Sequence, residues 1–263
     1  MMVASACAAL LAGCNSRGQP STQPSSPVLP TASTAPTSAA PTLPPPTSPP
    51  PVSLRAWLRA APISRLPTTR RVVALTFDGG SGAQGATAIL RTLRDARVPA
   101  TFFLTGDFVR THSDTMAEVA ASHYLVGNHT MTHPHLSQLS PAAVTEEIRD
   151  ADQQLRTVLG HSARPWFRFP FGEYDGRTLR VVHDLGYGAI GWTVDTRGWM
   201  GRGGGTPADI VSRVHEALQP GAIVLMHLGA NPDDGTTFDA DALPDVISAI
   251  RAAGYRLVAL TNW

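Results

Sequence analysis

The chain has 263 residues, 43% of them hydrophobic, which is enough for one domain with a sizeable core plus extensions. All 21 basic residues are arginines, and this excludes Schiff-base lysines and the phosphate-binding lysine of P-loops. Residues 1–77 contain six arginines and no acidic residue, whereas the remainder has fifteen arginines against twenty acidic residues. Such a mildly acidic domain is not typical of nucleic-acid binders, so no nucleic-acid partner is expected.

The N-terminal stretch "MMVASACAALLAGC" has an apolar run of about eleven residues, too short to span a bilayer as a helix. Its end, "LAGC", resembles the lipobox of bacterial lipoproteins, in which the cysteine becomes the lipidated first residue of the mature chain. No Lys or Arg precedes the run, so an ordinary signal peptide is the alternative. We expect residues 1–13 to be a signal peptide and Cys14 to be lipidated, which would anchor the protein to the cell membrane on its extracellular side.

Residues 14–53 consist mainly of Pro, Ser, Thr and Ala and contain no acidic residue. This composition cannot bury a core and favours polyproline II, so we expect a disordered linker that reaches on the order of 100 Å into the cell wall. Both cysteines, Cys7 and Cys14, precede the globular part. That part therefore has no disulfide and no zinc–thiolate site, and any metal must be bound by His, Asp or Glu.

Residues 54–69 form a lead-in segment whose Leu54, Trp57 and Leu58 are expected to cap the fold, with contact to an anionic surface as the alternative. From residue 70 to 263, strand and helix patterns alternate. Helices are predicted at 141–159 and 207–218, because each begins with a capping residue followed by proline. This alternation predicts a parallel sheet, as a barrel or a doubly wound sheet. The candidate strands are 71–77, 100–106, 124–130, 166–170, 187–195, 221–227 and 255–260.

Ionisable residues cluster where these strands end. Parallel β/α barrels build their active sites at that end of the sheet, so we predict the site there. Within "NHTMTHPHL", His129 and His133 have the spacing of paired zinc histidines and would share one face of a helical turn. Surface histidines also occur at this spacing by chance. His135, after a proline, is expected to point elsewhere. The strand-end residues are Asp78, His129, His133, Arg168, Asp195 and His227.

Five segments, "TFDGG", "HTMTH", "RFPFG", "DTRGW" and "LMH", resemble in order the five motifs of the polysaccharide deacetylases. This is the NodB-homology family, carbohydrate esterase family 4. The resemblance extends over about residues 70–260. It implies a distorted (β/α) barrel with about seven parallel strands, and metal-dependent removal of acetyl groups from amino-sugar polymers.

The resemblance also implies roles for individual residues. Asp78 corresponds to the general base and His227 to the general acid, while His129 and His133 correspond to ligands of a divalent metal. Zinc is expected first, with cobalt or nickel as alternatives. A purely structural role is the alternative, because an arginine–carboxylate pair with a neighbouring aromatic residue is also common in protein scaffolds. The other implied roles are orientation of the base by Arg168, the oxyanion contact of the Phe171 backbone N–H, and the acetyl pocket of Trp199 and Leu225.

Two positions depart from the family pattern. Gly79 replaces an aspartate that is a metal ligand in the family, and Gly198 replaces the aspartate that tethers the arginine and tunes the acid. Two histidines with water should bind a metal ion weakly. Asp195 is expected to be a catalytic residue, and its alternative role is that of the third metal ligand. Because base and acid are both present, we expect an active enzyme; the alternative is a lipoprotein that only binds glycan.

Other enzyme classes fit less well. The segments "GGSGA" and "GHSAR" both lack the Gly-x-Ser-x-Gly elbow of serine hydrolases. The loop "GRGGGTPAD" runs into a predicted helix, whose N-terminus could cradle a phosphate, but without lysine a mobile groove lip is the preferred interpretation. Wall peptidoglycan is the expected substrate, before other N-acetylglucosamine polymers, O-acetyl xylan or a small acylated amine. We expect a monomer.

Overall fold

The computed structural model describes residues 58, 61–80 and 82–261. The predicted signal peptide and linker, and with them Cys14, lie outside the described residues. Within the described residues, no helix is long and apolar enough to cross a membrane. The strands are β1 (Val72–Gly79), β2 (Thr101–Leu104), β3 (Leu125–Asn128), β4 (Trp166–Phe167), β5 (Gly188–Ala189), β6 (Val194–Asp195), β7 (Ala222–His227) and β8 (Arg256–Val258).

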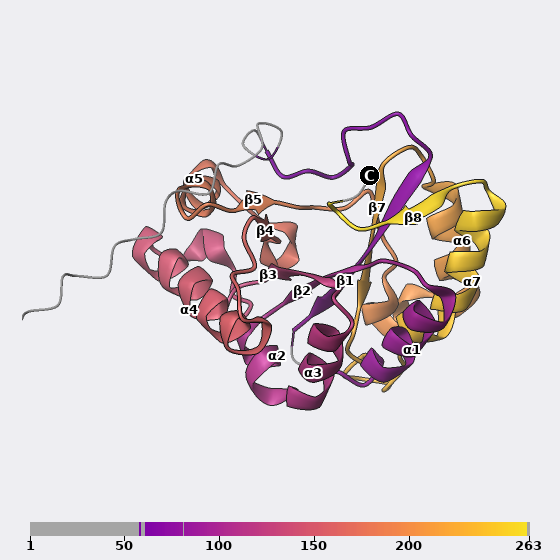
Figure 1. Ribbon diagram of the computed structural model, residues 1–263, viewed down its shortest axis with the longest axis horizontal. Coiled ribbons are helices and arrows are strands. Elements are labelled where there is room, and N and C mark those ends of the chain that lie inside the picture. Colours follow the sequence, from indigo (N-terminus) through magenta and orange to yellow (C-terminus); the bar gives the residue numbers. More distant parts are fainter. Residues whose placement is uncertain (1–57, 59–60, 81, 262–263) are drawn as a thin grey trace, which may run out of the picture. The chain divides into compact units, whose positions relative to one another are not determined.

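Helices alternate with these strands and surround the sheet (Figure 1). Among residues 61–80 and 82–261, three 3₁₀ helices lie in the loops. The α-helices are α1 (Ala86–Ala96), α2 (Gly106–Thr111), α3 (Ser113–Ala121), α4 (Pro141–Leu159), α5 (Gly176–Asp184), α6 (Pro207–Glu216) and α7 (Phe238–Ala252). The 3₁₀ helices are η2 (Leu136–Gln138), η3 (Pro170–Gly172) and η4 (Gly198–Gly204).

The strands form one parallel sheet in the order β5-β4-β3-β2-β1-β7-β6, and β8 adds a further parallel pairing to β1. The sheet curls into a half-barrel with helices on its outer side, which confirms the predicted distorted (β/α) barrel. Because all pairings are parallel, the carboxyl ends of the strands meet at one edge. The register places Asp78 of β1 directly beside His227 of β7.

β1 is the central strand, and every one of its residues is buried. Alternate side chains point to opposite faces of a strand. Val73, Leu75 and Phe77 pack in the large core that the helices cover, whereas Val72 and Ala74 pack in a second core inside the half-barrel. The same alternation places Asp78 on the inner face and Gly79 on the helix-covered face.

The stretch 187–195, predicted as one strand, is two short strands at opposite ends of the sheet, β5 and β6. The chain leaves the sheet between them, where Gly191 donates its N–H to the carbonyl of Ile63 at 2.9 Å. The lead-in segment runs beside this break: Ile63 N–H donates to Ala189 at 2.9 Å, and Leu66 N–H donates to Gly221 at 2.8 Å. Segments distant in sequence therefore meet here, which a local strand pattern does not indicate.

The two predicted helices begin where the capping residues place them. Ser140 accepts a hydrogen bond from Ala143 N–H at 3.2 Å, and α4 covers 141–159 as predicted. Thr206 and Asp209 form a reciprocal capping box at the start of α6.

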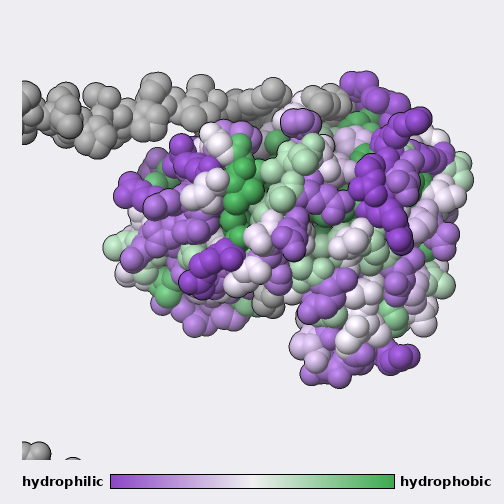
Figure 2. Space-filling model, turned by 60° about the horizontal axis from the view of Figure 1, so that its bottom comes forward, coloured by the Kyte–Doolittle hydropathy of each residue, from purple (hydrophilic) through white to green (hydrophobic). Residues whose placement is uncertain are grey.

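Polar side chains cover most of the face in Figure 2, where hydrophobic residues gather in a narrow band near the middle.

Candidate active site

A cleft of about 720 Å³ opens at the carboxyl ends of the strands. It brings together almost all the residues that the sequence predicted for the site. Arg168 is the exception within the described part of the chain, because it is completely buried beneath the cleft. The predicted residues that line the cleft are Asp78, His129, His133, Phe171, Asp195, Trp199, Leu225 and His227.

Arg168 holds the carboxylate of Asp78. Its Nη1 donates to Asp78 Oδ1 at 2.6 Å, while Nη2 donates to Thr76 Oγ1 at 3.0 Å. Its other hydrogen bonds go to the backbone carbonyls of Ile190 and Gly191, both at 3.1 Å. These hydrogen bonds fix the orientation of the guanidinium. Apart from Asp78, the groups that accept them are neutral.

Two effects oppose each other at Asp78. Burial acts to raise the pKa of its carboxyl group, but the positive charges of Arg168, and of His129 and His227 when protonated, outweigh burial and hold that pKa below its usual value. Asp78 is therefore ionised at neutral pH. A carboxylate with one oxygen on Arg168 and the other facing the cleft can accept a proton from water.

His129 and His133 lie side by side, with ring centroids 4.7 Å apart. His129 Nδ1 lies 2.9 Å from the Arg168 carbonyl, so Nδ1 is the protonated nitrogen and Nε2 faces Asp78 Oδ2 at 3.4 Å. Burial lowers the pKa of His129, and burial together with His129 lowers the pKa of His133 to about 4. Both imidazoles are neutral at neutral pH.

The "HTMTH" segment is a turn and not the helical turn considered from the sequence. Thr130 and His133 have φ angles of 69° and 62°, in the left-handed region that few non-glycine residues adopt. Glu147 of α4 holds this turn: its Oε2 accepts the N–H groups of Met131 and Thr132, both at 2.9 Å, and Oε1 accepts the Thr132 hydroxyl at 2.8 Å. Glu147 was not predicted from the sequence, because nothing in the helical pattern distinguishes it from the other charged residues of α4.

Within the part of the chain that the structure describes, His129 and His133 have no third ligand placed beside them. A catalytic zinc ion usually has three protein ligands and an open position. Among residues 58, 61–80 and 82–261, no group of three or more His, Cys, Asp and Glu side chains is placed to hold a metal ion. The described residues therefore do not fit the three-ligand metal centre of the family pattern.

Position 79 explains part of this difference. A Cβ atom at Gly79 would lie 2.7 Å from Leu104 Cδ2, 3.1 Å from Leu228 Cδ1 and 3.2 Å from Phe108 Cδ2. These three residues belong to the helix-covered core. A side chain at position 79 would thus enter an apolar core and not the cleft.

Asp195 holds Trp199 and is not placed as a third metal ligand. Its Oδ1 accepts the N–H of Arg197 at 2.8 Å, and its Oδ2 accepts Trp199 Nε1–H at 3.1 Å. From the other side, Asn231 Nδ2 donates to the Trp199 carbonyl at 2.8 Å. The indole is half exposed beside the cleft, and these hydrogen bonds anchor it from both sides.

Phe171 lies on the opposite side of the cleft and has a left-handed backbone, with φ 58°. Its ring is 51% exposed and packs edge-on against His133, with ring centroids 4.6 Å apart. His135 stacks on the same ring at 4.1 Å and pairs with Glu173 at 2.8 Å, away from the His129–His133 pair. A bulky residue in this backbone conformation is strained, and such strain is frequent in binding sites.

His227 is paired with a residue that the sequence analysis did not identify. Asp239, in the first turn of α7, accepts the backbone N–H of His227 through Oδ2 at 2.8 Å, and the same oxygen lies 3.4 Å from His227 Nδ1. Burial opposes protonation of the imidazole, but Asp239, followed by Asp78 and Asp195, outweighs it and raises the pKa of His227. The surroundings of His227 thus favour its protonated form, while those of Asp78 favour the ionised carboxylate.

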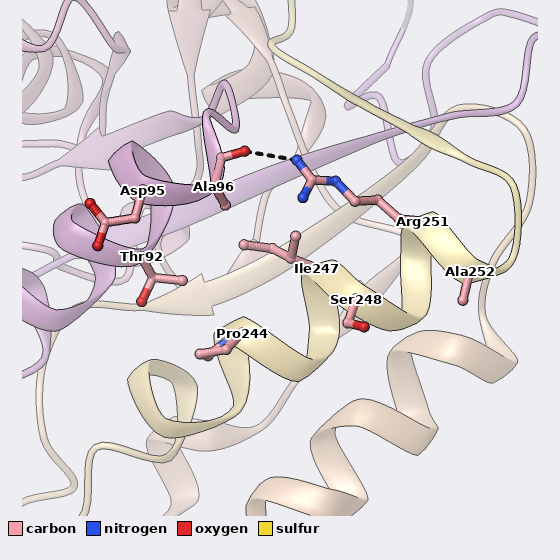
Figure 3. Close-up of a pocket in the computed structure, with 8 residues that line it drawn as sticks. All are labelled: Thr92, Asp95, Ala96, Pro244, Ile247, Ser248, Arg251 and Ala252. Atoms are coloured by element: carbon pink, nitrogen blue, oxygen red, sulfur yellow. Dashed lines mark hydrogen bonds between the residues drawn. The ribbon is translucent and has the colours of Figure 1, made fainter.

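A second hollow, of about 570 Å³, lies between α1 and α7 (Figure 3). Arg251 crosses it and donates to the carbonyl of Ala96 at 2.8 Å. None of the predicted site residues lines it, and its lining contains no histidine. The cleft at the strand ends is therefore the candidate active site.

Comparisons with known proteins identify the family of this chain. A sequence model of the polysaccharide deacetylases matches residues 65–190. A chitooligosaccharide deacetylase of Rhizobium leguminosarum bv. trifolii is 33% identical over 214 residues, which are 78% of this chain and 98% of the relative. A peptidoglycan-N-acetylglucosamine deacetylase of Bacillus cereus is 29% identical over 74% of this chain and 69% of its own length.

Among solved structures, a family 4 pseudoenzyme from Bacillus anthracis has a TM-score of 0.70 and 30% identity, over 76% of this chain and 68% of its own. A mutant of that pseudoenzyme with restored enzymatic activity has a TM-score of 0.69 and 31% identity, over 76% of this chain and 70% of its own. The chain therefore belongs to the polysaccharide deacetylase family, carbohydrate esterase family 4, whose deacetylases are hydrolases of carbon–nitrogen bonds other than peptide bonds.

Proposed function

We propose that this protein hydrolyses N-acetyl groups of N-acetylglucosamine polymers, with wall peptidoglycan as the first candidate substrate. The observation that supports this most is the direct pairing of Asp78 and His227 at the ends of adjacent strands. The named activities of the Rhizobium and Bacillus cereus relatives support the substrate class. Other acylated glycans and small amides are the alternative substrates.

In the proposed reaction, Asp78 is the general base and His227 the general acid. Water attacks the acetyl carbonyl carbon while Asp78 accepts a proton from it, and the carbon–nitrogen bond then breaks as His227 protonates the leaving amine. The products are acetate and the free amino sugar. The lowered pKa of Asp78 keeps the base ionised, and the raised pKa of His227 favours the protonated form that an acid needs.

The other residues of the cleft would orient the reacting groups. Arg168 keeps Asp78 ionised and in place through the 2.6 Å hydrogen bond. We assign the oxyanion contact to the backbone N–H of Phe171, because this residue lines the cleft with its backbone in the left-handed conformation. Trp199 and Leu225 would enclose the acetyl methyl group, since both line the cleft beside His227.

Deacetylases of this family are generally metal-dependent. For this chain we propose that any bound divalent cation, with zinc before cobalt or nickel, uses His129 and His133. Two neutral imidazoles, with no third ligand among the described residues, bind such a cation weakly. The steps assigned above to Asp78 and His227 are defined by those residues alone.

A catalytically inactive glycan-binding protein is the second candidate. The similarity to the Bacillus anthracis pseudoenzyme and the apolar surroundings of Gly79 favour it. The acid–base pair and its two charged partners favour activity. Release of acetate from a polymer decides between the two.

We further propose that Cys14 is lipidated and anchors the domain to the extracellular side of the membrane through the Pro-rich linker, as a monomer. The "LAGC" sequence and the composition of residues 14–53 support this. A Cys14→Ser variant should leave the membrane fraction with its domain activity unchanged. Membrane association that persists in the variant would contradict lipidation.

The function itself is tested by incubating purified residues 54–263 with chitooligosaccharide, peptidoglycan and O-acetyl xylan and measuring released acetate. The first two substrates should yield acetate, with equimolar free amine. Acetate from xylan alone would indicate an esterase, and no acetate from any substrate, with or without added zinc, would favour the glycan-binding alternative.

A further inference from the structure

Gly198 and Asp239 compete for one volume. A Cβ atom at position 198 would lie 2.4 Å from Cγ, 2.5 Å from Oδ1 and 2.7 Å from Oδ2 of Asp239. Real Cβ atoms essentially never make contacts this short. The backbone of Gly198 does not have a positive φ, so its conformation does not require glycine. The space that a side chain at 198 would use is already filled by a carboxylate from α7.

That carboxylate serves the strand ends and not its own helix. Asp239 is 3% exposed, and α7 has no side-chain cap hydrogen bond at its N-terminus. Its Oδ1 accepts the hydroxyl of Thr196 at 2.6 Å, and its Oδ2 accepts His227 N–H at 2.8 Å. A buried carboxylate needs such partners to remain charged, and the helix N-terminus adds a favourable dipole.

The imidazole of His227 completes the arrangement. Its Nδ1 is buried and has no hydrogen-bond partner among the described residues, and the Asp239 Oδ2 atom lies 3.4 Å away. This separation is longer than an ordinary N–H···O hydrogen bond, but a small rotation of the ring would close it. With Nδ1 directed at Asp239, Nε2 is the nitrogen left for proton donation in the cleft.

We propose that Asp239 is the positioning residue of His227, and that it substitutes in space for the aspartate that is absent at position 198. Asp239, which lies in a helix 41 residues after Gly198, thus takes the role of the aspartate that the fourth motif has in the family. It orients the imidazole, selects the tautomer and favours the protonated ring. This inference rests on the proposed function only for its catalytic consequence.

Replacement of Asp239 by Asn tests the charge at nearly constant shape. Turnover should fall on the order of 10²-fold, within the range for loss of general acid catalysis. The alkaline limb of the rate profile should move to lower pH, because His227 loses its proton more easily without Asp239. Asp241→Asn, an exposed acid in the same helical turn, is the matched control and should change neither. The other titratable groups that face His227 are Asp78, Asp195, His129 and His133.

A relocation variant separates positioning from mere packing. Asp239→Ala alone should lose activity and lower the pKa of His227. The double variant Gly198→Asp with Asp239→Ala should have a turnover at least about tenfold higher than that of Asp239→Ala, since the new carboxylate would enter the vacated volume. Gly198→Asp in the presence of Asp239 should instead destabilise the domain. A double variant that folds but recovers neither activity nor the His227 pKa would overturn the proposal.

An NMR titration of the His227 imidazole gives a readout that does not depend on activity. The pKa should fall in Asp239→Asn and return in the double variant, with folding checked by thermal melting. An unchanged His227 titration in folded Asp239→Asn would overturn the inference even in an active enzyme. If wild-type protein releases no acetate, the proposed function fails, while the titration still decides whether Asp239 controls His227.

Discussion

The guanidinium of Arg168 and the carboxylate of Asp78 form a buried pair, with Nη1 and Oδ1 2.6 Å apart and the arginine fully inaccessible to solvent. Buried ion pairs offset a large desolvation cost only when each charge keeps its partner. The two residues are 90 positions apart in the chain, on β1 and just after β4. The stability of the half-barrel and the charge of the proposed base therefore depend on the same contact.

Arg168→Met should destabilise the domain by about 3 to 5 kcal/mol, because it leaves Asp78 buried without its main partner. The pKa of Asp78 should rise, so the acid limb of the rate profile should move to higher pH. Urea unfolding and a pH–rate profile measure the two effects. Arg156→Met removes a half-exposed arginine whose buried partner, Asp152, still keeps Arg164, so it should cost about 1 kcal/mol or less. Equal losses in both variants would contradict the role of burial.

His133 should make the domain less stable in mild acid. The pKa of this histidine is about 4 in the folded protein, below its ordinary 6.5, so the unfolded chain binds more protons between these values. The free energy of unfolding should therefore fall as pH is lowered from 6.5 towards 4, by about 1 to 2 kcal/mol after solvent screening.

Urea unfolding with a chelator present, at pH 4.5 and at pH 7, measures this difference. His133→Asn should reduce it, whereas His161→Asn, at an exposed position, should leave it unchanged. A pH dependence that is identical in wild type and His133→Asn would show that other groups cause the acid sensitivity.

Gly79→Asp should not create the metal ligand that the family pattern has at this position. The new side chain would push against Leu104 and place a carboxylate among apolar side chains, at a cost of about 2 to 4 kcal/mol. Gly79→Ala isolates the steric part and should cost less. Thermal melts and zinc titrations of the three proteins provide the measurement. Tighter zinc binding by a folded Gly79→Asp variant would contradict the observed direction of this side chain.

Zinc binding by the wild type should be weak, with a Kd above about 1 µM, because only two histidines are available. Isothermal titration of metal-stripped protein measures the affinity. Replacing either His129 or His133 by alanine should abolish binding, while His135→Ala should not. Nanomolar affinity would require a further ligand that the described residues do not provide.

Much of the architecture follows from local sequence patterns. The continuous apolar run of β1 predicts a buried parallel strand, and proline after Ser140 and Thr206 predicts where α4 and α6 begin. Because parallel strands end at one edge, polar residues after each strand predict a shared cleft. Alternation along β1 agrees with Asp78 and Gly79 facing opposite ways, but only the structure shows that a side chain at position 79 would meet the core.

The remaining features depend on contacts between distant segments. Asp239 is one of several acids near the start of α7, and only the structure shows that it fills the space beside Gly198. Glu147 likewise resembles its neighbours on α4 until the turn at Thr130–His133 is placed against it. The division of 187–195 into β5 and β6 depends on the lead-in segment, which lies more than 100 residues earlier in the chain.

The most direct test of the account compares acetate release from an N-acetylglucosamine polymer by wild-type protein, Asp78→Asn and His227→Ala under one set of conditions. Wild type should turn over, and each variant should lose about 10² to 10⁴ in turnover while its thermal melt shows a folded domain. Asp114→Asn, at an exposed position in α3, should match wild type. Near wild-type acetate release by folded Asp78→Asn or His227→Ala would contradict the assignment of these residues as base and acid.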